Sequence, residues 1–255
     1  MKLKTCLALL LPAFTAYSAE SSSQVNINVV HSNHSVSIIK LPLGARFSDF
    51  LLSSQLPSDI YWRSAQISNR QNHAKIMADK ITLLNDLKAL QVQWMRNGDM
   101  GAWVQSSQQI IIEIDRINVT GRLPIVIDPV INRSHEDKNP ILSGDYTLFT
   151  SPRSQFIYFT GLINGASRQL LREGAGLADY WQAYSLLAGA DLAQAYLIQP
   201  TGEVSLVPVA VWNQLHREPM AGATLFVGFD TDLLPAKYKN LNLRIANLLA
   251  NRIPE

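Results

Sequence analysis

The stretch GARFSDFL at residues 44–51 recurs in altered form as GAGLADYW at residues 174–181. Glycine, alanine and aspartate keep their places, and the other positions share a pattern of large apolar, small and aromatic residues. Each copy has the spacing of a short amphipathic helix between strand-rich stretches. Asp49 and Asp179 fall near the helix start, where the helix dipole favours a carboxylate. The repeat predicts two similar units rather than one large enzyme core.

Composition sets the general class of the protein. The chain has 255 residues, a length that suits one large domain or two small ones. Hydrophobic residues make up 47% of the chain, which supports a packed core. Charged residues make up 16%, which excludes a disordered or strongly charged protein.

Residues 1–19 predict a cleaved signal peptide. A basic start precedes an apolar run at residues 7–14, and small residues allow cleavage after Ser18 or Ala19. A membrane anchor needs about 20 apolar residues, which is longer than this run. Cleavage would remove Cys6, the one cysteine, and two lysines, so that the formal net charge falls from +2 to 0 (20 basic and 20 acidic residues). We therefore expect a periplasmic or secreted protein without disulfides, and no nucleic-acid partner.

The first predicted unit covers residues 20–131. Alternating apolar residues predict a strand over residues 24–30, and a second strand begins at Val36. A helix over residues 47–51 and a further strand beginning at residues 60–62 complete the series. Hairpin, helix and strand is the order of a β-grasp domain.

Helical spacing then interrupts this unit. It predicts a helical hairpin insertion from about residue 69 to 118, although the β-branched run at residues 110–112 is also consistent with a strand. The apolar run at residues 123–127 predicts a buried strand. The polar stretch at residues 132–140 predicts a domain linker.

Residues 141–231 predict a second β-grasp domain on the same plan, so the expected fold class is α+β. A helical face begins at Leu177 and continues to Leu187, with Gly189 as its cap. The expected strands are residues 146–150, 155–160, 195–198, 204–209 and 224–227.

Residues 232–255 predict a C-terminal amphipathic helix over residues 235–252. Such a helix would be about 27 Å long. Its basic and amide-rich opposite face argues against a lone membrane span. Two interpretations stay open: the apolar face packs on the second domain, or it binds a partner or a membrane surface. The residues of interest are Lys237, Tyr238, Leu241, Arg244, Ile245, Leu248 and Leu249.

The residues that most often carry chemistry form no convincing set. His31 and His34 are better explained by a polar hairpin turn than by a metal site, and the sequence has no nucleotide-binding loop or nucleophile motif. A polysaccharide-modifying enzyme would need two carboxylates about 5 to 10 Å apart. The available carboxylates are scattered along the chain: Glu113, Asp115, Asp128, Asp179 and Glu203.

In the order of its features the chain resembles the GfcC family of capsule and exopolysaccharide assembly proteins. The resemblance covers most of the predicted mature chain and includes GRLPI at residues 121–125 followed by IDP at residues 127–129. It also includes the predicted signal peptide, strand-rich start, helical insertion, second unit and terminal helix. The resemblance implies two SLBB-like β-grasp domains, akin to those of Wza-type outer-membrane polysaccharide exporters, and a periplasmic, non-enzymatic accessory role.

The resemblance also implies partners and a site. The partner would be a polysaccharide or the outer-membrane export machinery, with no cofactor or metal. The Gly-Arg-x-Pro match makes Arg122 a candidate binding residue, with a structural contact between domains as an equal alternative. In such exporters a C-terminal amphipathic helix crosses the outer membrane in a barrel, and the similarity suggests related packing here. On that interpretation, deleting residues 235–255 should leave a folded protein with impaired capsule assembly; the alternative function is a periplasmic polysaccharide-modifying enzyme.

Overall fold

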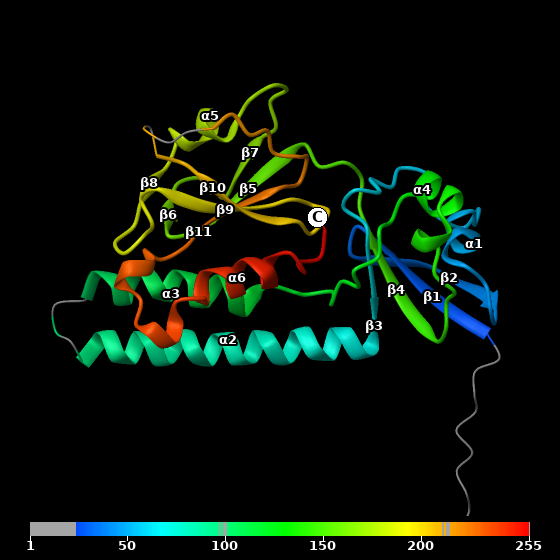
Figure 1. The fold of residues 1–255 in the computed structure, drawn as a ribbon, viewed down its shortest axis with the longest axis horizontal. Coiled ribbons are helices and arrows are strands. Elements are labelled where there is room, and N and C mark those ends of the chain that lie inside the picture. Colours follow the sequence, from blue (N-terminus) through cyan, green and yellow to red (C-terminus); the bar gives the residue numbers. More distant parts are fainter. Residues whose placement is uncertain (1–23, 97, 99–100, 211, 213–214, 255) are drawn as a thin grey trace, which may run out of the picture.

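The computed structural model describes residues 24–96, 98, 101–210, 212 and 215–254. It shows a mixed α+β fold with several sheets and helices (Figure 1). The predicted signal peptide at residues 1–19, Cys6 included, lies outside the described residues. Within the described residues, no helix has the length and apolar character needed to cross a membrane.

The first sheet is built from both ends of the first unit. Its strands have the order β2-β1-β4-β3, and β1 and β4 lie parallel at its centre. Alternation buries Val25, Ile27 and Val29 against the helix α1 (Phe47–Leu51), as the sequence predicts. The strands are β1 (Gln24–His31), β2 (His34–Pro42), β3 (Gln66–Asn69) and β4 (Asp145–Thr150).

The assignment of residues 146–150 to the second unit is wrong. This segment forms β4, which pairs in parallel with β1 and antiparallel with β3, and so closes the first sheet. The pairing joins residues that are 119 positions apart, such as Asn26 and Asp145. The local periodicity of a strand does not indicate which distant strand it pairs with. The strand expected at residues 60–62 is also displaced, because the chain turns there and pairing begins only at Gln66.

Residues 123–140 contain neither the predicted strand nor a linker. Residues 123–127 form no strand, and the nearest pairing is a single bridge between Arg122 and Ser68. The expected linker overlaps the helix α4 (Pro129–Ser134) and the 3-10 turn η2 (Glu136–Lys138). The reason is side-chain capping: Asp128 accepts hydrogen bonds from the first turn of α4, and the fully buried Asn132 donates to the carbonyls of Val126 and Lys138.

The second sheet has the order β10-β9-β11-β5-β7, with β5 and β11 parallel. Its strands are β5 (Phe156–Gly161), β7 (Arg168–Leu170), β9 (Gln194–Ile198), β10 (Val204–Pro208) and β11 (Thr224–Val227). The strands predicted at residues 155–160, 195–198, 204–209 and 224–227 are therefore confirmed within two residues at each end.

The helix of the second unit is shorter than the sequence predicts. The helix α5 (Leu177–Trp181) begins as expected, with the Asp179 carboxylate accepting from the backbone of Gly176 at 2.8 Å. It ends long before residue 187, because Tyr184 stacks on Phe159 and donates a hydrogen bond to the carbonyl of Ala166. The chain then enters a small two-stranded sheet, β6 (Ile163–Asn164) with β8 (Ser185–Leu186).

The predicted helical hairpin is confirmed, and it packs on the second sheet. It consists of α2 (Arg70–Arg96) and α3 (Gly101–Arg116), so residues 110–112 are helical. Trp94 of α2 lies against Phe229 with 5.4 Å between ring centroids. Glu113 of α3 accepts hydrogen bonds from Thr160 and from the backbone of Gly161 in β5. The insertion interrupts the first unit in sequence and belongs to the core of the second (Figure 1).

The C-terminal helix is half as long as predicted and is built into the body. After the 3-10 turns η3 (Thr231–Leu233) and η4 (Ala236–Tyr238), α6 covers only Leu241–Leu249. It packs against α2 and β9, as its position beside the hairpin indicates (Figure 1). The prediction of one helix over residues 235–252 is wrong because the chain folds back at η4, which buries Tyr238, and forms extended contacts after residue 250.

Candidate functional site

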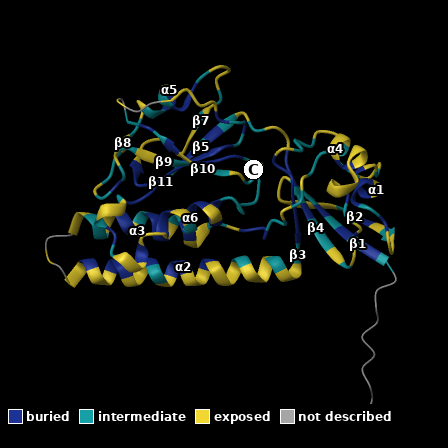
Figure 2. Ribbon diagram, viewed as in Figure 1, coloured by how far each residue is buried: buried dark blue, intermediate teal, exposed yellow. Residues whose placement is uncertain are grey.

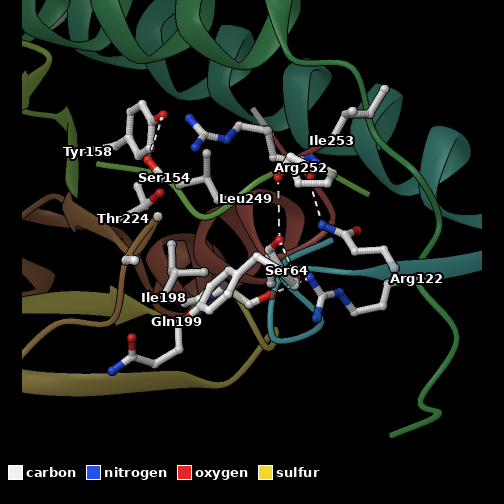
Figure 3. Close-up of a pocket in the computed structure, with 18 of the residues that line it drawn as sticks. Ser64, Arg122, Ser154, Tyr158, Ile198, Gln199, Thr224, Leu249, Arg252 and Ile253 are labelled. Atoms are coloured by element: carbon white, nitrogen blue, oxygen red, sulfur yellow. Dashed lines mark hydrogen bonds between the residues drawn. The ribbon is translucent and has the colours of Figure 1, made fainter. Parts of the chain in front are cut away.

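A small polar cavity lies where the two units meet. Its walls come from the turn before β3, from Arg122, from the crossover at residues 151–154, from the second sheet and from the C-terminal tail (Figure 3). The cavity volume is about 40 Å³. A buried water molecule needs about 10 to 15 Å³ of such space, so the cavity admits a few water-sized polar groups rather than a sugar ring.

Arg122 is held in this cavity by contacts to both units. Its backbone N–H donates to the side chain of Asn251 at 2.8 Å, and its carbonyl accepts from Asn72 at the start of α2. Its Nη2 donates to the carbonyl of Pro200 at 2.7 Å, in the turn between β9 and β10. Gly121 is required just before it, because φ is +72° and a Cβ atom would lie 2.5 Å from the backbone of His73.

The guanidinium of Arg122 is a buried cation without an acidic partner. Burial lowers the pKa of Arg122 from its ordinary value to about 10, so the side chain stays protonated at neutral pH. Its Nε is buried without a hydrogen-bond partner, and no carboxylate of the described residues lies within ion-pair distance. An unpaired cation in a low-dielectric site costs free energy, so the site favours the arrival of an anion or a strong acceptor.

The rest of the cavity is lined by hydroxyl and amide groups together with apolar side chains such as Ile198 and Leu249. Ser64 and Ser151 lie 3.4 Å apart, and Ser154 lies 3.5 Å from the hydroxyl of Tyr158. The guanidinium of Arg252 lies 4.5 Å from the centre of the Tyr158 ring. None of the described residues that line the cavity is acidic. Figure 3 shows the two arginines reaching this cavity from different segments of the chain.

Comparison with known proteins identifies the family. Residues 23–153 match the family model described as Capsule biosynthesis GfcC, N-terminal, and residues 165–254 match the model described as Capsule biosynthesis GfcC C-terminal. The chain belongs to the GfcC capsule biosynthesis family. It is similar to a protein of Escherichia coli strain K12, "Uncharacterized protein YjbG", with 32% identity over 252 residues and 99% of each chain covered. Membership in the GfcC family implies a role in capsule assembly.

The match boundaries agree with the pairing of the strands. The N-terminal GfcC match ends at residue 153, three residues after β4, and the C-terminal match begins at residue 165. Both boundaries place β4 with the first unit, as its pairing with β1 does. The crossover at residues 151–154 lines the cavity of Arg122. The candidate site of this GfcC protein therefore lies at the boundary between its two units.

The terminal-helix candidates of this GfcC protein are mostly core residues. Lys237 is exposed beside the Tyr238 ring, and Arg244 forms an ion pair with Asp86 of α2 at 2.7 Å. Leu249 also lines the cavity of Arg122, and the others do not reach it. The buried members, each at most 7% exposed, are Tyr238, Leu241, Ile245, Leu248 and Leu249. Their packing favours the opposite of the sequence-based expectation, namely that deletion of residues 235–255 unfolds part of the protein.

The carboxylates considered for catalysis serve other roles or are exposed. Glu113 binds β5, and Asp128 and Asp179 cap the helices α4 and α5. The side chains of Asp115 and Glu203 are exposed, and neither residue lines the cavity. Within the described residues, no group of three or more His, Cys, Asp or Glu side chains is arranged to hold a metal ion.

Of the residues that line this cavity, the sequence names only Arg122 and Leu249 as candidates. Ser64, Ser151, Tyr158 and Arg252 come from four separate segments. No local motif joins these segments, because the tail reaches the cavity through contacts with residues far away in sequence, such as Thr120 N–H to the carbonyl of Asn251. The one available signal was the Gly-Arg-x-Pro sequence itself.

Proposed function

We propose that this GfcC-family protein is a non-enzymatic accessory protein of capsule or exopolysaccharide assembly or export, working in the periplasm. It acts by binding the polysaccharide or the outer-membrane export machinery, and it needs no cofactor. The amino-terminal sequence, with its basic start and apolar run, supports the periplasmic location. The two family matches support the role in capsule assembly.

We also propose that both units are β-grasp domains of the SLBB-like kind. In each unit an antiparallel strand pair precedes a short helix, and the last strand lies parallel to the first at the centre of the sheet. The repeated octapeptide supplies that helix in both units. The two units share this plan and differ in the elements that complete each core.

The observation that best supports a binding role is the incomplete hydrogen bonding of the buried Arg122 side chain. A buried guanidinium with one carbonyl partner and an unpaired Nε gains most from a ligand that supplies oxygen acceptors. Polysaccharides carry hydroxyl and acidic groups of a size that the cavity admits. The five carboxylates named for an enzyme do not meet at this cavity, so a polysaccharide-modifying enzyme is not the function that we propose.

The test is a complementation experiment in a strain that lacks this protein. We compare the wild-type protein, Arg122→Gln, and Arg133→Gln as a control that removes the same charge from an exposed site on α4. The cell-bound and released fractions of the polysaccharide are measured separately. We expect Arg122→Gln to lower the cell-bound fraction at least several-fold at equal protein level, and Arg133→Gln to match the wild type. Wild-type fractions for Arg122→Gln would contradict the proposal.

A further inference from the structure

A second and larger cleft lies beside the C-terminal tail, on the face of the first sheet that α1 does not cover. Because Val29 and Leu148 face α1, their neighbours Val30 and Phe149 point to the opposite face. Val30 and Phe149 are direct partners across β1 and β4 and form the floor of the cleft. Its volume is about 600 Å³, within the range of about 300 to 1,000 Å³ that is usual for ligand sites.

The wall of this cleft is fixed by backbone contacts between distant segments. The N–H of Ile253 donates to the carbonyl of Asn118 at 3.1 Å, and Val119 is bridged to Arg252. Lys80 donates to two carbonyls at the end of α3, those of Asp115 and Ile117, at 2.8 and 2.7 Å. These contacts hold the end of α3 and the tail side by side, so the cleft is formed without a ligand.

The polar side chains on this wall are cationic and amide groups, and Ile117 and Ile253 line it as well. Arg116 and Arg252 supply two guanidinium groups, and Asn118 and Asn33 supply amides. Among the described residues, the side chains of Asn33, Arg116 and Asn118 have no hydrogen-bond or ion-pair partner. None of the described lining residues is acidic. Guanidinium groups pair with carboxylates, amides bind hydroxyls, and the Phe149 ring offers an apolar surface.

We propose that this cleft binds an acidic sugar of the polysaccharide, with the sugar carboxylate paired to Arg116. The inference rests on the proposed function for the ligand being a glycan, and adds that the glycan is anionic. The cleft and the cavity of Arg122 share Arg252 and Ile253 as lining residues. One glycan chain that passes the tail therefore has access to both sites.

The experiment measures binding of trigalacturonate to the purified protein by calorimetry, with its fully methylated ester as the neutral probe. We expect the acid to bind at least about tenfold more tightly than the ester, and Arg116→Gln to weaken binding of the acid about tenfold, since one charge-assisted hydrogen-bonded pair is lost. Arg133→Gln is the matched control and should leave binding unchanged. Raising the salt from about 0.1 M to about 1 M shortens the Debye length from about 10 Å to about 3 Å and should weaken binding of the acid alone.

A second variant tests the sign of the charge. Asn118→Asp keeps the side-chain shape and the backbone contact of Asn118, and places a carboxylate on the wall. It should weaken binding of the acid and spare the ester. Equal affinity for the two probes, no binding of either, or binding that Arg116→Gln leaves unchanged would overturn the cleft site. The proposed function is tested separately by the polysaccharide fractions of Arg122→Gln, because Arg122 does not line this cleft.

Discussion

The two units share a strand plan and differ in what covers their sheets. In the first sheet, β1 alternates between buried and half-buried residues, because α1 covers one face only. In the second sheet, all four residues of β11 are buried, because α5 covers one face and α3 and α6 the other. Figure 2 shows this contrast between the two sheets. The core of the first unit is completed by its own strands and α1. The core of the second unit depends in addition on α3 and α6, which lie outside the stretch of sequence that forms its strands.

The largest test of this contrast is deletion of residues 235–255. The deletion removes the buried side chains of α6 and η4 and exposes the part of the second sheet that α6 covers. Burial of each large apolar side chain contributes about 1.5 to 3 kcal/mol, so losing five costs about 7.5 to 15 kcal/mol, as much as the usual total stability of about 5 to 15 kcal/mol. We expect the second unit to unfold and the first to stay folded. Hydrogen exchange read by mass spectrometry would show fast exchange in β9 and β11, and protection in β1 and β4.

Protection of β9 and β11 in the truncated protein would contradict this dependence. A matched control is truncation after Ala250, which removes only the tail after α6. That shorter truncation should keep the second sheet protected. If both truncations unfold the first unit as well, the two units form one cooperative body.

The next test is Trp94→Ala compared with Phe50→Ala. Trp94 lies in the hairpin that interrupts the first unit, yet it packs on Trp103 and Phe229 in the core of the second. Phe50 lies in α1 within the core of the first. Each change should lower the free energy of unfolding by about 3 to 5 kcal/mol. Trp94→Ala should act on the second unit and Phe50→Ala on the first, as judged by hydrogen exchange in each sheet.

Equal loss of protection in both sheets for either variant would remove the distinction between the two cores. Ile81→Ala serves as the control on α2, because Ile81 is 56% exposed on the outer face of that helix. A change at such a site should alter the free energy of unfolding by no more than about 0.5 kcal/mol.

Local periodicity predicted the elements of this protein better than their partners. The strand at residues 24–30, the helix at residues 47–51 and the hairpin at residues 69–118 follow from short-range patterns, and the structure confirms them. The sheet to which β4 belongs, and the unit on which the hairpin packs, depend on contacts between residues more than 40 positions apart in sequence. The same limit applies to the candidate site, because Arg122 lies in a local motif and the other residues of its cavity do not.

The errors have specific physical causes. The polar run at residues 132–140 looked like a linker, but a buried Asn132 satisfies the backbone around it and holds α4 in place. The terminal helix looked long enough to bind a partner, but η4 breaks it and its apolar face is used inside the molecule. In both cases tertiary contacts gave the segment a structure other than the one that its composition predicts.

The smallest expected effect is that of Arg122→Gln on stability, and it separates a binding role from a structural one. Burial lowers the pKa of Arg122 in the folded state to about 10, below its ordinary value, so the folded protein holds this proton less tightly than the unfolded chain. The charge therefore opposes folding at every pH below about 10, and the cost is relieved only as the pH rises above about 10. Removing the charge should raise the free energy of unfolding at pH 7 by on the order of 1 kcal/mol, measured by chemical denaturation.

The opposite result would assign Arg122 a structural role. Its bond to the carbonyl of Pro200 joins the two units, and if that bond outweighs the cost of the buried charge, Arg122→Gln must lower the free energy of unfolding. Adding trigalacturonate gives a second comparison of the wild type with Arg122→Gln. If the carboxylate reaches Arg122, it raises the unfolding midpoint of the wild type more than that of Arg122→Gln, since a ligand stabilises only the state that binds it. A residue that merely joins the units would give equal shifts, because its contribution does not depend on the ligand.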